Sequence, residues 1–195
     1  MKDRFREATA RAILDAAEKT LAEEGLQAAR MEAIAAHAGV AVGTVYNYFA
    51  DRASLLAALL AARREGLVAA LDGALASAEA EAFAAQLETF LRAFLAHVEA
   101  HRAFFAMLVE GDPGKAHGHA TGALDAVYGR FEVLVGRGVA SGALRPAHAE
   151  LYPALLIGMC RGLTLREFRV RRGAGLASKA PALTQVFLDG AGATK

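Results

Sequence analysis

The chain has 195 residues, enough for one good core or two small packed units. Hydrophobic residues make up 55% of it and only four prolines occur, which favours an all-α protein. The formal net charge of +1 argues mildly against binding to nucleic acid through charge alone. A single cysteine excludes an intrachain disulfide, and we find neither a signal pattern nor an apolar run of the roughly 18 residues that a membrane span needs, so we expect a cytoplasmic protein.

Three helices are expected at the start of the chain. The first covers about residues 4–24 and ends at Gly25, where a glycine can stop a helix. Apolar residues three and four positions apart then predict helices over about 31–38 and 42–49. Gly39 between them suits a tight turn, because glycine adopts a positive φ without a Cβ clash. Two short helices that meet at such a turn are typical of a helix-turn-helix.

A fourth helix should begin after Asp51, whose carboxylate can accept hydrogen bonds from the free N–H groups of the first turn. It carries an apolar face and should reach the mid-seventies. Further helices are expected over about 79–98, around 104–108, and over about 123–140, 147–171 and 181–189, with a loop in the glycine-rich stretch 111–121. The sequence therefore predicts about nine helices.

Residues 30–56 resemble the DNA-binding domain of the TetR (tetracycline-repressor-like) family of bacterial transcriptional regulators. The resemblance rests on Ile34-Ala35, Ala38-Gly39-Val40, Gly43-Thr44-Val45-Tyr46, Tyr48-Phe49 and the run Asp51 to Leu56. It covers roughly the first quarter of the chain. It implies an all-α fold in which a three-helix helix-turn-helix DNA-binding domain (residues 1–50) precedes a larger helical ligand-binding and dimerisation domain (residues 51–195).

The resemblance and the shortness of the third helix point to a set of DNA-contacting residues. These are Arg30, Val42, Gly43, Thr44, Tyr46, Asn47, Tyr48 and Arg52. Two positions depart from the family pattern. Ala41 stands where an N-cap serine is common, which loses a hydrogen bond worth roughly 1 kcal/mol. Val42 stands where a polar or basic residue is common, so it would offer only apolar contact, for example to a thymine methyl.

The rest of the chain is expected to pair two subunits and to bind a ligand, because one helix-turn-helix reads only a few base pairs. The candidate residues of the dimer interface are Leu155, Leu156, Met159, Leu163, Leu183, Val186 and Phe187. The candidate residues of a pocket for an apolar or aromatic effector are Phe90, Phe94, Phe104, Phe105, Met107, Tyr128, Phe131, Tyr152 and Met159. The alternative for both sets is that they are plain core within one chain.

The resemblance thus implies a sequence-specific transcriptional regulator, by family default a repressor, that binds a palindromic double-stranded operator as a homodimer and is released by a small ligand, with no cofactor. Other functions stay open. His97 and His101 are spaced so that they could share a metal, as in an enzyme, although no HExxH pattern occurs. The arginines between residues 161 and 172 could form a second nucleic-acid patch or simply complement a helix dipole. A helical interaction protein that has lost DNA binding is the third possibility.

Overall fold

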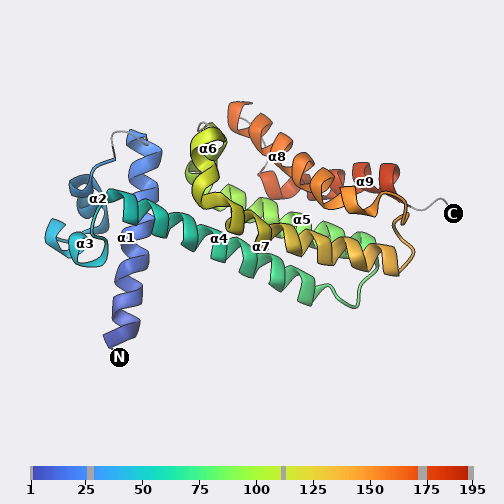
Figure 1. Ribbon diagram of the computed structural model, residues 1–195, viewed down its shortest axis with the longest axis horizontal. Coiled ribbons are helices and arrows are strands. Elements are labelled where there is room, and N and C mark those ends of the chain that lie inside the picture. The colour runs from blue at the N-terminus through green and yellow to red at the C-terminus, as the bar shows by residue number, and fades with distance from the viewer. Residues whose placement is uncertain (1, 26–28, 111–112, 171–174, 193–195) are drawn as a thin grey trace. The chain divides into compact units, whose positions relative to one another are not determined.

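The computed structural model describes residues 2–25, 29–110, 113–170 and 175–192, and these residues form helices and connecting turns without a β-strand (Figure 1). The elements are α1 (Lys2–Glu24), α2 (Met31–Ala38), α3 (Val42–Tyr48), α4 (Arg52–Ser77), α5 (Phe83–Ala100), α6 (Arg102–Glu110), α7 (Pro113–Ala140), the 3₁₀ turn η1 (Ala149–Leu151), α8 (Tyr152–Val170), the 3₁₀ turn η2 (Leu176–Lys179) and α9 (Ala180–Ala191). The predicted all-α fold is confirmed.

The chain divides into two compact units, each of which is described by itself. Unit 1 comprises residues 1–63 and 103–110, and unit 2 comprises residues 64–102 and 111–195. Helix α4 begins in unit 1 and ends in unit 2, so one continuous helix belongs to both. The functional division expected at residue 50 stays a prediction.

Unit 1 is built on the inner face of α1, where Ile13, Ala17 and Leu21 are buried. Helices α2, α3 and the first turns of α4 pack on this face, and Phe104 of α6 joins the same core. These side chains recur at helical spacing in each segment, so every helix presents one apolar face to a shared interior.

The turn between α2 and α3 is closed by Gly39, which has a φ of 68°. The Gly39 N–H donates to the Ala36 carbonyl and the Val40 N–H donates to the Ala35 carbonyl, at 3.2 and 3.1 Å. This pair of bonds satisfies the last carbonyls of α2 and turns the chain sharply into α3. The left-handed conformation explains why a glycine stands here.

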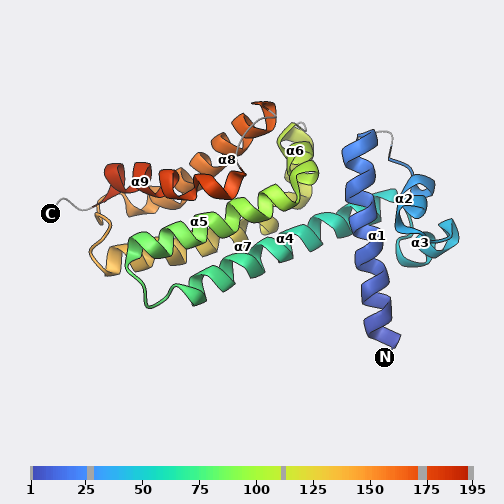
Figure 2. The ribbon, with the colours of Figure 1, turned by 180° about the vertical axis from the view of Figure 1, so that it is seen from behind.

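Unit 2 consists of helices packed around α5. Helix α5 buries an apolar stripe that includes Phe83, Leu87 and Phe90, and it contacts α9, η2, α7 and α8. In both views α8 and α9 lie together along one side of α5 and α7, and the second half of α4 lies along the other side (Figures 1 and 2).

Two expectations about unit 2 were wrong. The glycine-rich stretch to residue 121 was expected to be a loop, but α7 already begins at Pro113. Proline suits the first position of a helix because its missing N–H would have no partner within the helix. The helix expected from residue 147 begins only at Tyr152, because His148 has a φ of 64° and η1 intervenes.

Candidate nucleic-acid interface

Val45 is the fully buried side chain of helix α3, and it lies in the core of unit 1 together with Ile34 and Leu55. Val42 and Tyr48 pack partly against the same core, so these contacts together decide which side chains of the short helix face outward. Its N-terminus has no side-chain cap at Ala41, and the Thr44 N–H donates to the Ala41 carbonyl at 2.8 Å instead. The missing N-cap hydrogen bond is thus seen directly.

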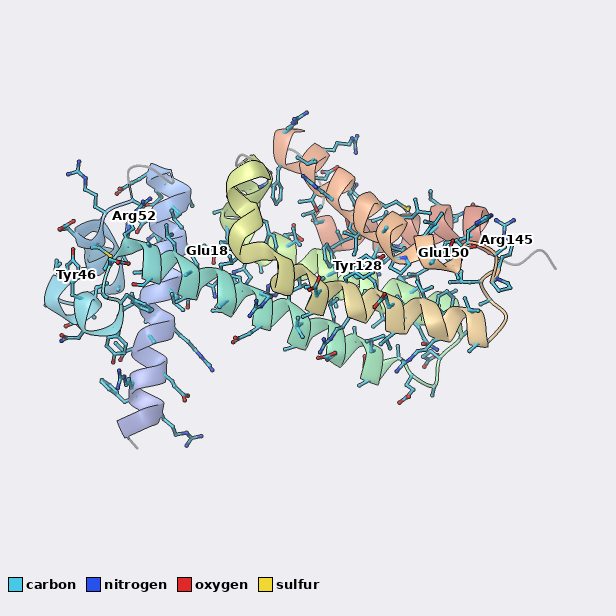
Figure 3. The ribbon with its side chains drawn as sticks, viewed as in Figure 1. Glu18, Tyr46, Arg52, Tyr128, Arg145 and Glu150 are labelled. Carbon is cyan, nitrogen blue, oxygen red and sulfur yellow. The ribbon has the colours of Figure 1, made fainter. Side chains whose placement is uncertain are left out.

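The outer surface of α3 carries the residues expected to contact DNA. Gly43, Tyr46 and Asn47 are exposed, and Tyr46 keeps 47% of its surface accessible on the outer side of the helix (Figure 3). A Cβ on Gly43 would meet no atom within 4 Å, so the backbone is open to close approach at this point. Val42 and Thr44 are half-buried, and Val42 packs partly against the core of unit 1.

Tyr48 lies under a cation that sequence spacing does not reveal. The guanidinium carbon of Arg6, on α1, lies 5.8 Å from the centre of the Tyr48 ring. The Tyr48 ring is also tilted against Phe49, with 6.4 Å between the ring centres. An arginine over an aromatic face is an attractive cation–π arrangement. No sequence signal relates Arg6 to Tyr48, because only the shared core of unit 1 brings the two helices together.

Two further arginines flank α2 and α3. Arg30 is exposed and occupies the N-cap position of α2 with extended backbone. The Arg52 side chain lies at the start of α4 and donates from Nε to the Ala29 carbonyl at 2.8 Å (Figure 3). This bond ties Arg52 to the segment that precedes α2, so its cation stays close to the helix-turn-helix.

Three carboxylates of α1 lie close to basic side chains. Arg63 donates to Glu18 at 2.7 Å and to Asp15 at 2.6 Å, and this pairing joins α4 to α1 (Glu18 is labelled in Figure 3). Glu23 lies 3.2 Å from Nε2 of His37 on α2. Pairing with basic side chains lessens the repulsion between these acids and a phosphate backbone.

The turn after α3 is closed by a reciprocal cap. Asp51 accepts the Ser54 N–H at 2.7 Å, and the Asp51 N–H donates back to the Ser54 hydroxyl at 3.1 Å. The backbone hydrogen bond from Ser54, with help from its hydroxyl, lowers the pKa of the Asp51 carboxyl. The predicted N-cap role of Asp51 is confirmed, and the cap sets where α4 begins.

The residues expected to line a ligand pocket fall into separate groups. Phe90 and Phe131 are fully buried in unit 2 and meet edge to face, 4.8 Å between centres, and Phe94 packs on Phe131 at 5.7 Å. Tyr152 packs edge to face on Phe187, and Tyr128 and Met159 are half-buried. Phe104 and Phe105 belong to unit 1, and the Met107 side chain lies outside the described residues. The common pocket stays a prediction.

Two hollows of unit 2 lie between α4 and α7, with volumes of about 380 and 460 Å³. Neither is lined by a residue of the expected pocket. In both, Arg130 pairs with Asp72, 2.9 Å between Nε and Oδ1, and this hydrogen bond lowers the pKa of the Asp72 carboxyl. Several charged side chains line each hollow, which makes both a poor match for an apolar effector.

The residues expected at a dimer interface divide by exposure. Leu155 of α8 and Val186 of α9 are 53% and 65% exposed, which is unusual for large apolar side chains. Leu156 and Phe187 face the other way and are buried within the chain. The remaining members, Met159, Leu163 and Leu183, are half-buried.

The two remaining candidate sites are the histidine pair at the end of α5 and the arginine run at the end of α8. The rings of His97 and His101 lie 4.7 Å apart, and no group of three or more possible metal ligands forms among the described side chains.

At the end of α8, Arg102 donates to the Glu167 carbonyl and its guanidinium lies over the Phe168 ring. The exposed arginines of this end are Arg161, Arg166 and Arg169, whereas Arg171 and Arg172 lie outside the described residues. Both interpretations of this arginine run stay open.

Comparison with known proteins agrees with this architecture. Residues 13–59 match the family model described as "Bacterial regulatory proteins, tetR family". Among solved structures, the fatty acid degradation regulator FadR from Bacillus halodurans superposes with a TM-score of 0.81 at 20% identity, over 93% of this chain and 95% of that one. FadR from Bacillus subtilis in complex with stearoyl-CoA gives a TM-score of 0.78 at 17% identity, over 92% and 98%.

A third similar structure is the TetR family transcriptional regulator PfmR from Thermus thermophilus, with a TM-score of 0.72 at 23% identity, over 91% of this chain and 94% of that one. No curated protein sequence matches the chain. At these identities the structural likeness establishes the fold, and these solved structures are titled as regulators of transcription or of fatty acid degradation.

The fold and the exposed outer face of α3 thus define an all-α protein with an N-terminal helix-turn-helix of the DNA-binding class. Residues 13–59 match the model of the tetR family of bacterial regulatory proteins, and the chain shares its fold with the TetR family transcriptional regulator PfmR. Among the helices described, none has the length and hydropathy to cross a membrane.

Proposed function

We propose that this protein is a transcriptional repressor that binds a palindromic operator as a homodimer and leaves it when a small apolar or aromatic ligand binds. The DNA-binding half rests on one observation above all. Helix α3 is anchored through Val45 and turns Gly43, Tyr46 and Asn47 outward, which is the arrangement that a helix needs to enter a major groove. Arg30, Thr44, Tyr48, Val42 and Arg52 complete the proposed contact set.

The dimer is proposed from the outer face of α8 and α9. Leu155 and Val186 expose apolar surface that a lone chain would leave in water. On the same helices Gly158 and Gly190 are exposed, and a Cβ at either would meet no atom of the chain within 4 Å. Small residues beside exposed leucine and valine let helices of two subunits approach closely. A two-fold dimer would then place two α3 helices about 34 Å apart, one turn of DNA.

The effector half of the proposal rests on the aromatic cluster of unit 2 and on the fold. Phe90, Phe94 and Phe131 contact one another, and an apolar ligand that inserted between their rings would be surrounded by apolar surface. Since one solved structure of this fold holds stearoyl-CoA, a long-chain acyl-CoA is the first effector to test. Helix α4 would carry the change, because its first half packs in the core of unit 1 and its second half belongs to unit 2.

DNA selection from a random duplex pool tests the first half of the proposal. We expect enrichment of a palindromic site and about a tenfold loss of affinity for Tyr46→Ala, whose side chain is 47% exposed and lies outside the buried core. Val133→Ala, an equally exposed apolar residue on α7, is the control. Recovery of no common sequence would refute DNA recognition.

Titration of the selected complex with stearoyl-CoA, free fatty acids and small aromatic compounds tests the effector half. We expect at least one to release the DNA. Failure of all of them would remove the effector from the proposal and leave DNA binding intact.

A further inference from the structure

Arg6 occupies a special position on α1. A helix turns about 100° per residue, so Arg6 lies on the same face as Ala10, Ile13 and Ala17. Ile13 and Ala17 are fully buried in the core of unit 1, whereas Arg6 is exposed. The inner face of α1 therefore emerges from the core at Arg6, beside the end of α3.

The charge of Arg6 is not neutralised within the described side chains. Its recorded contact is with the Tyr48 ring, whereas Arg63 of the same unit is bound by two carboxylates. A guanidinium over an aromatic ring is restrained by the ring, while its N–H donors lie in its own plane and stay available for hydrogen bonds. Two such N–H groups can donate side by side to two oxygens of a phosphate group.

We propose that Arg6 is a phosphate-binding residue of the DNA interface and that Tyr48 positions it. This inference rests on the proposed DNA-binding function and adds a contact from α1 to those of the helix-turn-helix. Tyr48 is half-buried and contacts both Arg6 and Phe49, so its ring orients the arginine in addition to its own place in the proposed contact set. The contact is to the DNA backbone and therefore strengthens binding to all sequences alike.

The test compares Arg6→Gln with Arg11→Gln, which removes the same charge from the same helix. Arg11 is exposed and lies five positions further along α1, about 140° around the helix from Arg6. Affinity for the selected operator and for an unrelated duplex is measured by fluorescence anisotropy at a series of salt concentrations.

For Arg6→Gln we expect about a tenfold loss of affinity on both duplexes, and a slope of log K against log salt that is shallower by about one for each Arg6 in the complex. Arg11→Gln should keep the wild-type slope. Tyr48→Leu should reduce the slope in the wild-type background and leave it unchanged in the Arg6→Gln background, because the ring acts through Arg6.

An unchanged slope for Arg6→Gln would overturn the assignment, since a purely structural role would alter stability without altering counterion release. Additive slope losses for Tyr48→Leu and Arg6→Gln would overturn the positioning role. These failures differ from failure of the proposed function, in which the wild-type protein itself selects no DNA.

Discussion

The Thr20 hydroxyl oxygen lies 2.8 Å from Nδ1 of His37, and this contact joins α1 to α2. Thr20 is fully buried and also donates to the Ala16 carbonyl at 2.8 Å. Which atom donates between Thr20 and His37 depends on the tautomer of the ring. Nε2 of the same ring lies 3.2 Å from a Glu23 carboxylate oxygen, and the two form an ion pair when the imidazole is protonated. Since α2 leads into α3 through a tight turn, this link helps to set the orientation of the DNA-reading helix.

Thr20→Val should therefore lower the free energy of unfolding by about 1 kcal/mol, because the shape is kept and the buried link to His37 is lost. Thermal and urea unfolding measure the change. Thr9→Val is the matched control, since the Thr9 hydroxyl donates only to the Phe5 carbonyl within α1 at an exposed position. Equal effects of the two substitutions would show that the contact with His37 contributes nothing.

The two glycines of the helix-turn-helix should respond to alanine in opposite ways. Gly39→Ala places a Cβ at a φ of 68° and should cost about 1 to 2 kcal/mol. Gly43 lies inside α3 with open space around it, so Gly43→Ala should leave stability equal or raise it by up to about 1 kcal/mol. The added methyl should nevertheless weaken operator binding, because it stands on the face that approaches DNA. Unfolding curves and binding assays on both variants separate the two effects.

The cap at Asp51 predicts a dependence on pH. Its carboxyl has a pKa lowered from 3.8, so the charged form stabilises the fold above that pH, and the stabilisation disappears as the pH falls through the lowered value. The unfolding midpoint of Asp51→Ala should lie below that of the wild type at pH 7, and the gap should narrow in acid. Asp51→Asn keeps an acceptor oxygen for Ser54 and should lose less at pH 7. A gap that is constant with pH would contradict this account.

The exposed apolar residues of α8 and α9 predict the effect of charge on assembly. Leu155→Glu and Val186→Glu should each convert a dimer into monomers and reduce operator affinity at least tenfold, since a buried unpaired carboxylate costs several kcal/mol. Val133→Glu tests the same change at a residue that is 50% exposed on α7 and should leave the dimer intact. Light scattering coupled to gel filtration gives the mass. Monomeric wild-type protein would refute the interface.

The reactivity of the Cys160 thiol can serve as a probe for the opening of unit 2. It is fully buried, and this burial raises the pKa of its thiol to about 12. We expect a thiol reagent at pH 8 to react with it slowly in the folded protein and rapidly in denaturant, because the thiolate is the reactive form. If an effector separates the helices around it, its labelling rate should change on binding. Rapid labelling of the folded protein without ligand would contradict the burial.

Much of the DNA-binding unit could be predicted from local sequence. Gly39 between two short apolar patterns specifies the turn, because only a left-handed residue closes it. Asp51 three positions before Ser54 specifies the start of α4, because their groups cap each other within one turn. Such features depend on neighbours in the chain, so spacing reveals them.

Local sequence predicted the starts of α7 and α8 wrongly, because the backbone there adopts a conformation that the residue composition does not indicate. Gly and Pro around residue 113 predicted a loop, yet Pro113 stands at the first position of α7. His148 adopts a left-handed conformation that is not expected for a histidine, so α8 begins later in the chain than predicted.

By itself, then, the sequence determined most of the helices, the glycine turn and the face of α3 that looks outward, since each follows from the short-range geometry of one helix. Only the tertiary structure decided that Arg6 lies over Tyr48, that Thr20 meets His37, and that Arg63 binds two acids of α1. These partners are far apart along the chain, and side-chain periodicity carries no information about which faces of separate helices meet. Their contacts exist because burial of the shared core fixes the helices against one another, and the electrostatic character of the interface follows from that packing.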